Sequence, residues 1–378
     1  MVDFFADTDT RSIAHATRKI TGHIRRGFTW AALERALLAL DKEAPSPIMG
    51  FVYGAGFEDR PHLLTPIGER WPLFGNDAAT LKRLKAPETF FAGLAQLGIP
   101  HPKTRTTPPP SLAGWLMKRR GGAGGSHVRP ASKTARDDGY YQEIVPGRAV
   151  SALFVGDGER ATALGFSEQW TAPKRNAPFR YGGAVRPALL PSRIEEAMAS
   201  IVTQVTAAFA IRGLASADFM VCDEDAVLLE INPRPGATLD IFDSDEMPLL
   251  QLHLDAMVKP GLPDVPLKLT GAAASGIVYA PETVTIGKEV IWPRWAMDRP
   301  QPGDRIDKDR PICTVAARAQ TLKGAKNHIE ARISAILAAL HGRSGGKINE
   351  QKDGRKHAPH GLAERQHPRR AARSKAHR

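Results

Sequence analysis

Residues 215–234 read ASADFMVCDEDAVLLEINPR, and this stretch predicts a β-hairpin. Two apolar runs flank three consecutive acids at 223–225, which suit an exposed turn between two strands. If those three residues form the whole loop, Cys222 pairs with Ala226 across the hairpin. This register then fixes the partner of every other residue, because side chains alternate between the two faces of a strand.

Three oxygen-bearing side chains gather on one face of the hairpin in this register. Asp218 lies directly opposite Glu230, and Asn232 shares the face of Glu230. Opposed side chains lie about 4.5–5.5 Å apart at Cβ, where like charges repel. A hard cation between them removes that cost, and such oxygen ligands suit Mg²⁺, which also bridges to substrate phosphates. The alternatives are a surface hairpin with two solvated acids, or a register shifted by one residue that puts the acids on opposite faces.

A lysine and a glycine-rich loop precede the hairpin. Residues 114–118 read GWLMK, a short strand ending in Lys118, and residues 119–127 read RRGGAGGSH. Glycine lets the backbone approach a ligand closely, and successive N–H groups can form an anion site. The loop matches neither the P-loop nor the Rossmann pattern, so alone it is equally consistent with a flexible turn. Together with the carboxylate hairpin, it predicts a site for a magnesium nucleotide.

Four segments follow one another in a distinctive order. The lysine and glycine-rich loop are followed by QEIVPG at 142–147, GLASADF at 213–219 and EINPR at 230–234. This order and spacing resemble the ATP-grasp superfamily of carboxylate–amine ligases, over about residues 74–242. The resemblance implies an α+β fold in which two α+β subdomains clasp ATP. It also implies an α/β pre-grasp domain before them. Short strands between Pro and Gly over about 262–315 indicate a small β-rich appendage after them.

The resemblance assigns roles to individual residues. Lys118 matches a lysine at the α- and β-phosphates, and Arg234 matches a basic residue that steadies the transferred phosphoryl group or acyl-phosphate; both are expected to be catalytic. The expected ligands of Mg²⁺, or alternatively Mn²⁺, are Asp218, Glu230 and Asn232. The residues expected to bind ATP are Lys118, Gly121, Gly122, Ala123, Gly124, Gly125 and Ser126 around the loop, with Gln142, Glu143 and Val145 in the adenine hinge.

Two positions depart from the family pattern. The acid that often holds the ribose is replaced by Ala149. A second phosphate-binding lysine usually stands near the start of the helix before Gly-Ile-Pro, and here that place is near Pro87. Lys82 or Lys85 could take its role, and the sequence leaves that choice open.

Four segments with less specific motifs resemble a narrower group within the ATP-grasp superfamily. They read GFVYGAGFE at 50–58, FRYGG at 179–183, PGATLD at 235–240 and WPRW at 292–295. They are similar to ATP-grasp proteins of one-carbon cofactor biosynthesis, such as the tyramine–glutamate ligase group of methanofuran synthesis. The resemblance implies an amino-acid-like small molecule as substrate.

Arg180 and Tyr181 are the expected substrate-binding residues. In that interpretation Arg180 binds a substrate carboxylate, whereas the alternative is a purely structural loop.

The implied reaction has two steps: a carboxylate attacks the γ-phosphate of ATP to give an acyl-phosphate and ADP, and an amine then displaces phosphate. Such chemistry needs cations, backbone amides and metal ligands rather than a nucleophile. Consistently, the sequence has neither G-x-S-x-G nor H-E-x-x-H.

The expected function is therefore an ATP-dependent C–N ligase that releases ADP, with small-molecule carboxylate and amine partners. The alternatives are an ATP-grasp kinase without an amine step, a nucleotide sensor, and a nucleic-acid-associated protein. The sequence contains no run of about 18 apolar residues, the length that would suggest a membrane span. The two cysteines are far apart and fit a reduced, cytoplasmic protein. Dimers are usual among the proteins that this chain resembles, so a homodimer is one option for its assembly.

The expected domains are 1–105 (pre-grasp, with its first β–α unit missing), 106–258 (ATP-grasp), 259–341 (β-rich appendage and closing helix) and 342–378 (basic tail). The tail holds 11 Lys/Arg and 3 Asp/Glu, so +8 of the net charge of +12 lies there. With almost no apolar residues it is expected to be disordered. It could attract nucleic acid or an acidic surface weakly, although a solvated extension is the simpler interpretation.

Hydrophobic periodicity predicts the remaining elements. Helices are expected over 30–40, 89–97 and 324–340, and a strand over 48–53. A capping box at 192–195 is expected to open a further helix that Gly213 ends.

Overall fold

The structure, a computed structural model, describes residues 2–4, 30–43, 50–134, 137–222, 225–244, 248–262 and 269–341. The basic tail lies outside the described residues, and so does most of the acidic turn of the hairpin. Within the part that is described, we find no helix whose length and apolarity would suffice to span a membrane.

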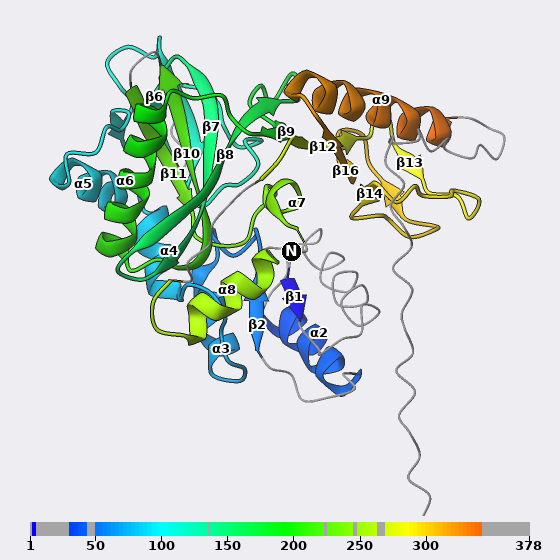
Figure 1. The fold of residues 1–378 in the computed structure, drawn as a ribbon, viewed down its shortest axis with the longest axis horizontal. Helices are drawn as coiled ribbons and strands as arrows, with labels where there is room; N and C mark the ends of the chain where they lie inside the picture. Colours follow the sequence, from blue (N-terminus) through cyan, green and yellow to red (C-terminus); the bar gives the residue numbers. More distant parts are fainter. Residues whose placement is uncertain are drawn as a thin grey trace, which may run out of the picture.

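Helices and strands alternate irregularly along the chain (Figure 1). The helices are α2 (Trp30–Glu43), α3 (Leu64–Gly68), α4 (Ala78–Lys85), α5 (Pro87–Gln96), α6 (Ser192–Phe209), α7 (Leu239–Phe242), α8 (Leu249–Val258) and α9 (Leu322–His341), with a 3₁₀ turn η1 at Pro61–Leu63. The first strands are β1 (Val2–Phe4), β2 (Phe51–Tyr53), β3 (Thr104–Arg105), β4 (Trp115–Arg119), β5 (Arg129–Pro130), β6 (Gly139–Glu143), β7 (Arg148–Asp157) and β8 (Ala161–Thr171). The later strands are β9 (Tyr181–Arg186), β10 (Arg212–Cys222), β11 (Asp225–Asn232), β12 (Ala272–Tyr279), β13 (Val284–Thr285), β14 (Ala296–Met297), β15 (Arg305–Ile306) and β16 (Pro311–Ala319).

An eight-stranded antiparallel sheet with the order β11-β10-β7-β8-β9-β12-β16-β14 organises the fold. Strand β7 is buried on both faces because Ala152 and Phe154 pack in the α6 core, while Leu153 and Val155 pack in the α8 core. Helices α6 and α8 therefore cover opposite faces of the same strands, and Figure 1 shows α6 beside β10 and β11. A sheet buried in this way is rich in apolar residues in both side-chain directions.

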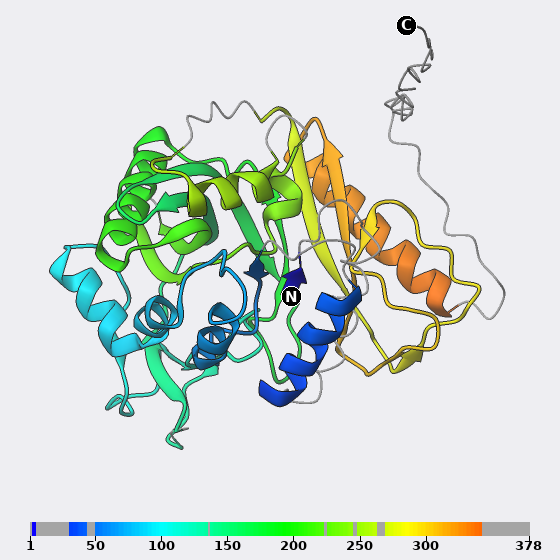
Figure 2. The same cartoon turned by 90° about the horizontal axis from the view of Figure 1, so that it is seen from below.

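A four-stranded sheet, β3-β6-β4-β5, forms the second layer around the site. In it Lys118 pairs with Tyr140, and Leu116 pairs with Gln142. The C-terminal strands β12, β16 and β14 extend the large sheet, and α9 packs along them over a core of its own. Figure 2 shows α9 (orange) beside these yellow and orange strands. The predicted β-rich segment is thus continuous with the central sheet, while the predicted domain boundaries stay predictions.

The N-terminal residues form a lobe that buried and partly buried hydrogen bonds fix to the large sheet and to α8. Asn76 donates from Nδ2 to the carbonyls of Arg212 (3.0 Å) and Pro233 (2.9 Å), and its Oδ1 accepts from the Arg212 N–H (2.9 Å). His253 Nδ1 accepts from the Leu214 N–H at 2.9 Å, which leaves Nε2 to donate to the Phe74 carbonyl at 2.9 Å. These contacts place the lobe against the end of β10 that leads to the site.

The helical predictions need corrections at their ends. Helix α6 has the predicted apolar stripe, but its N-cap is Pro191 without a side-chain hydrogen bond, so the predicted capping box is wrong. The helix ends at Phe209, where Ala210 takes a left-handed conformation (φ 54°), and not at Gly213, which already lies in β10. Helix α5 begins at Pro87, two residues before the prediction, because proline suits the first helical position.

Helices α2 and α9 are confirmed: α2 extends beyond its predicted end to Glu43, and α9 begins before its predicted start, at Leu322, and ends at His341. Of the strand predicted over 48–53, the structure describes Phe51–Tyr53 as β2, and residues 48–49 lie outside the described part.

Candidate functional site

The β10–β11 hairpin places the two acids opposite each other as predicted, but by a different route. Asp218 pairs with Glu230, whereas Cys222 pairs with Asp225 rather than with Ala226, so the predicted loop is one residue too long. A bulge between Asp218 and Phe219 compensates for this difference, since Phe219 pairs with Leu228. The bulge leaves Leu229 as the extra residue of β11.

Asp218 sits in a network of hydrogen bonds on this face of the sheet. Its Oδ1 accepts from Ser151 Oγ (2.7 Å) on β7 and from Gln169 Nε2 (3.0 Å) on β8. Its Oδ2 accepts from Asn232 Nδ2 at 3.0 Å. Burial and the negative charge of Glu230 raise the pKa of Asp218. Three strands therefore supply neutral donors that hold a carboxylate in place next to a second one.

Two lysines flank the other carboxylate. Lys85 Nζ and Lys118 Nζ each lie 3.9 Å from a different oxygen of Glu230, and their side chains are about nine-tenths buried. Lys85 also donates to Asn232 Oδ1 at 3.0 Å, and Lys118 donates to Gln142 Oε1 at 3.1 Å. Burial alone would raise the pKa of Glu230, but the two lysines outweigh burial and lower it. Burial alone would lower the pKa of Lys118, but its neighbours Tyr140 and Glu230 outweigh burial and raise it.

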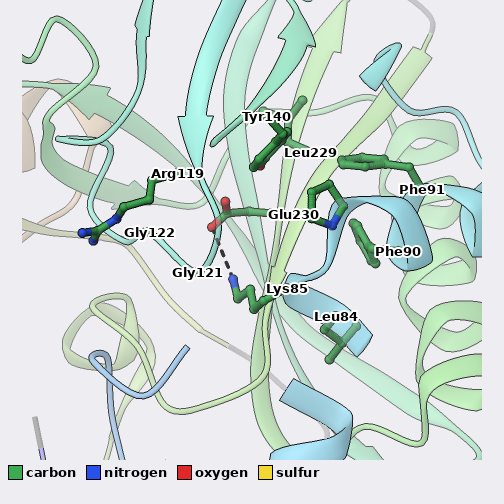
Figure 3. A pocket seen from close by; sticks show the side chains of 11 residues that line it. Leu84, Lys85, Phe90, Phe91, Arg119, Gly121, Gly122, Tyr140, Leu229 and Glu230 are labelled. Atoms are coloured by element: carbon green, nitrogen blue, oxygen red, sulfur yellow. Dashed lines mark ion pairs between the residues drawn. The ribbon is translucent and has the colours of Figure 1, made fainter. Parts of the chain in front are cut away.

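A pocket opens beside this charged cluster, between α4–α5 and strands β4, β6 and β11. Figure 3 shows Lys85 pointing toward Glu230 at its edge, with Phe90 and Phe91 on the opposite side. The residues that line it are Leu84, Lys85, Pro87, Phe90, Phe91, Arg119, Gly121, Gly122, Tyr140, Leu229 and Glu230. The pocket therefore combines aromatic walls with ionised groups and glycine backbone.

The glycine-rich loop is folded over this region and docked on a neighbouring segment. Gly124 and Gly125 have φ of 67° and 68°, a conformation that glycine adopts without strain. The carbonyl of Gly124 accepts from the Tyr181 N–H at 3.0 Å. A Cβ on Gly125 would overlap the Phe179 carbonyl oxygen, whereas a Cβ on Gly124 would meet nothing within 4 Å. Loop residues Ala123, Gly124 and Ser126 are exposed, so they can meet a ligand.

The predicted adenine hinge follows β6. Gln142 is buried against Lys118, and Glu143 forms an exposed ion pair with Lys103 at 3.6 Å. The backbone N–H groups of Glu143 and Ile144 donate to carbonyls of the protein. The N–H of Val145 has no partner among the hydrogen bonds of the described residues. Val145 is therefore the hinge residue whose backbone is left for a ligand.

Arg234 lies beside the cluster and is held by a residue from the N-terminal lobe. Its Nε donates to Glu58 Oε1 at 2.6 Å, and its Nη1 donates to the Pro235 carbonyl at 3.3 Å. Both members of the ion pair are buried. Burial alone would raise the pKa of Glu58, but Arg234 and Lys85 outweigh burial and lower it to about 2.

Arg180 is largely occupied by contacts within the protein. It donates to the carbonyls of Ala172 (2.8 Å) and Asp309 (3.1 Å), and its guanidinium lies 3.7 Å from the centroid of the Tyr279 ring. These contacts favour the structural alternative for Arg180, because they connect the loop before β9 with the C-terminal strands. Tyr181 contacts the glycine-rich loop through its backbone. A substrate-binding role for either residue stays a prediction.

Several residues of the site escaped the sequence patterns. Lys85 was one of two open choices, and Glu58, Ser151 and Gln169 were not expected at all. A signal for Lys85 did exist: it follows the buried Leu81 by four residues, so helical spacing puts it on the inward face of α4, while Lys82 is exposed. Ser151 and Gln169 stand on strands with no distinguishing pattern.

Comparisons with known proteins agree with this geometry. A family model described as an ATP-grasp domain matches residues 89–238. A search of curated proteins finds no match. The fold is similar to a biotin carboxylase–β,γ-ATP complex from Campylobacter jejuni, at 15% identity over 79% of this chain and 76% of that chain, with a TM-score of 0.61.

Two further solved structures show the same likeness. An L-amino acid ligase from Bacillus licheniformis is 16% identical over 80% of this chain and 83% of its own, with a TM-score of 0.61. An N5-carboxyaminoimidazole synthase from Aspergillus clavatus, in complex with ADP and 5-aminoimidazole ribonucleotide, is 12% identical over 81% and 85%, with a TM-score of 0.58. Taken with the cluster of lysines and carboxylates, the family match shows that this chain contains an ATP-grasp domain and has the ATP-grasp fold.

Proposed function

We propose that the protein is an ATP-dependent ligase that joins a carboxylate to an amine through an acyl-phosphate and releases ADP. The observation that carries this proposal is the convergence of Asp218, Glu230 and Asn232 with Lys85 and Lys118 at one end of the large sheet. Two acids opposed on paired strands are costly unless cations compensate them, and a buried cluster of coupled charges beside a pocket is typical of a functional site. The ATP-grasp domain supplies the chemical context.

The chain's own groups suit the binding of ATP. Lys118 and Lys85 approach different oxygens of Glu230 and can neutralise phosphate oxygens, while backbone N–H groups of the glycine-rich loop can surround those oxygens. The free N–H of Val145 suits the edge of adenine, which is recognised by hydrogen bonds from a hinge backbone. These contacts position the nucleotide, which is the main task of a protein in phosphoryl transfer.

The oxygen ligands fit a magnesium ion. Carboxylate oxygens from Asp218 and Glu230 and the amide oxygen of Asn232 are hard ligands from two adjacent strands. Asp218 faces the second carboxylate of Glu230 on the paired strand, and a divalent cation between the two would relieve their repulsion. When bound, Mg²⁺ would shield the phosphate oxygens and polarise the phosphoryl group that is transferred.

Arg234 suits the next stage of the reaction. Arg234 follows Asn232 by two positions in the sequence. Its side chain is buried, and its guanidinium is held by Glu58. A fixed guanidinium can bind a carboxylate or phosphate through parallel hydrogen bonds, so it can hold the carboxylate in line with the γ-phosphate. It can then stabilise the charge of the acyl-phosphate until an amine displaces phosphate.

The substrate class rests on resemblance. The segments at 50–58, 179–183 and 235–240 favour an amino-acid-like small molecule in cofactor biosynthesis, and the similar L-amino acid ligase fits a small carboxylate and an amine. A thermal-shift screen with Mg-ATP, amino acids and pterin or furan precursors would identify the pair. A cytoplasmic location stays the expectation, and a homodimer stays one option for the assembly.

Measurement of ADP release tests the proposal. Release should require both an acid and an amine; release with the acid alone would indicate a kinase instead. Glu230→Ala should abolish turnover with an unchanged far-ultraviolet circular dichroism spectrum, because one ligand and the partner of both lysines are lost. Glu69→Ala, which removes an exposed acid of the N-terminal lobe, is the control. Full activity of Glu230→Ala at saturating Mg²⁺ would refute the metal assignment.

A further inference from the structure

We propose that Glu58 is a positioning residue, which holds the Arg234 guanidinium in the orientation that stabilises the phosphoryl group while it passes to the substrate carboxylate. The inference rests on the proposed function. Glu58 lies outside the segment that matches the ATP-grasp family model, and it comes from a different lobe than the residue it holds.

The geometry of the pair is tightly fixed from both sides. Glu58 Oε1 accepts from Arg234 Nε at 2.6 Å, and Glu58 Oε2 accepts from the Gly56 N–H at 2.8 Å. The side chains of Glu58 and Arg234 are 1% and 10% exposed. A carboxylate whose two oxygens are both engaged cannot rotate freely, so it fixes the plane of the guanidinium that it contacts.

The contact leaves part of the guanidinium for a ligand. Arginine has five donors in a rigid fork, and Glu58 takes the Nε–H, while Nη1 contacts the Pro235 carbonyl at 3.3 Å. Among the hydrogen bonds of the described residues, none uses Nη2 of Arg234. A group that is oriented on one side and free on the other is suited to present donors to an anion.

The loop at 56–59, which carries Glu58, also contacts the glycine-rich loop. A Cβ on Gly121 would overlap the Glu58 carbonyl and would lie 2.6 Å from the Asp59 backbone nitrogen. Asp59 Oδ2 lies 3.8 Å from Arg119 Nη2, at the start of that loop. The loop at 56–59 thus contacts both the proposed phosphate loop and Arg234. A change at Glu58 should therefore act mainly where the phosphoryl group is transferred, because the side-chain hydrogen bonds of Glu58 among the described residues do not involve the adenine hinge at 142–145.

A transition-state analogue separates positioning from a purely structural role. We suggest measuring the affinity for MgADP alone and for MgADP with aluminium fluoride, which imitates a phosphoryl group in transfer. Glu58→Gln, Arg234→Ala and the double variant would be compared with Glu69→Gln, an exposed acid of the same lobe. Circular dichroism and thermal midpoints would check folding.

The inference predicts a selective loss. Glu58→Gln should bind MgADP within twofold of the wild type and lose at least tenfold of the tightening that fluoride brings. Arg234→Ala should lose the tightening too, and the double variant should lose no more than Arg234→Ala, because Glu58 acts through Arg234. Wild-type tightening in Glu58→Gln, or an equal loss of MgADP affinity, would overturn the inference.

Two further outcomes are distinguishable. If the wild type does not bind MgADP, the proposed function fails. If Glu58→Gln does not fold, Glu58→Asp is measured in the same way: it retains the charge but is one methylene shorter and cannot reach both partners. At least a fivefold loss of tightening supports the inference, and full tightening overturns it.

Discussion

Alanine at Gly125 should weaken nucleotide binding far more than alanine at Gly124. The two residues are neighbours in the glycine-rich loop and have nearly the same φ, 68° and 67°. Forcing a residue with a Cβ into this conformation costs about 1 kcal/mol at either position, or roughly fivefold in affinity. The pair is therefore matched for backbone strain and differs in what surrounds the new methyl group.

The surroundings make Gly125 the costly position. Its Cβ would overlap the carbonyl oxygen of Phe179, which is backbone and cannot change rotamer, whereas the Cβ at Gly124 meets open space. Relief requires the loop to leave this segment and to give up the hydrogen bond from Tyr181 N to the Gly124 carbonyl. Overpacking costs about 1–3 kcal/mol and a lost hydrogen bond about 1 kcal/mol, so the total loss is about 100-fold or more.

Isothermal titration with MgATP measures both losses directly. We expect about fivefold weaker binding for Gly124→Ala and about 100-fold or more for Gly125→Ala. Thermal midpoints would show whether either variant changes the fold as a whole. Equal losses at the two positions would refute the reasoning, because backbone strain alone would then account for both and docking of the loop on residues 179–181 would be irrelevant to binding.

Three further predictions concern the lysines of the site and the contacts of the N-terminal lobe. Lys85→Ala should weaken MgATP binding at least tenfold, because the Lys85 ammonium, 3.0 Å from Asn232 Oδ1, lies in the site where it can neutralise phosphate. Lys82→Ala, on the exposed face of α4, should bind MgATP as the wild type does. Equal affinities of the two variants in a nucleotide titration would contradict the assignment. Arg234 and Lys85 outweigh burial and hold the pKa of Glu58 at about 2 in the folded protein, against about 4.3 in the unfolded chain. Ionised Glu58 therefore contributes about 3 kcal/mol to the free energy of unfolding above pH 4.3. This contribution is lost as the pH falls toward 2. Urea unfolding of Glu58→Gln should lack that part of the acid dependence, and an unchanged pH profile would contradict the buried ion pair. Asn76→Ala should lower the urea midpoint by the equivalent of about 2–3 kcal/mol, since it removes three hydrogen bonds between the lobes; a midpoint equal to the wild type would show that the lobe is held by other contacts.

Local sequence carried enough information to predict the centre of the site. The acid pair, Lys118 and the glycine-rich loop all depend on neighbours within a hairpin or a turn, where period and turn chemistry are informative. The apolar stripe of α6 was predictable for the same reason, because a 3.6-residue period marks its buried face. The ends of that helix were not, since a left-handed Ala210 gives no signal in the sequence.

The partners of these residues could not be predicted because they come from distant parts of the chain. Glu58 and Arg234 are separated by 176 positions, and Asp218 and Ser151 by 67. Such pairs are set by the order of strands and by the docking of the N-terminal lobe, neither of which leaves a periodic pattern. Arg180 illustrates the reverse case, because a residue that looks suited to a substrate from the sequence is engaged by Asp309 from a strand-end turn far away.

The bulge in β11 explains how one hairpin can serve both a core and a charged site. Ala226, Leu228 and Ile231 all pack in the α6 core, with a spacing of two residues and then three. In a regular strand, Glu230 would share the face of Leu228 and would point into that core, where an unpaired carboxylate is very costly. The extra residue, Leu229, reverses the alternation, so that Glu230 joins Asp218 on the opposite face and Ile231 returns to the core. A single extra residue thus lets the same strand place apolar side chains in the core and Glu230 in the charged site. Counting alternate residues back from Glu230 without the bulge puts Leu228 on the face of the site, which is wrong.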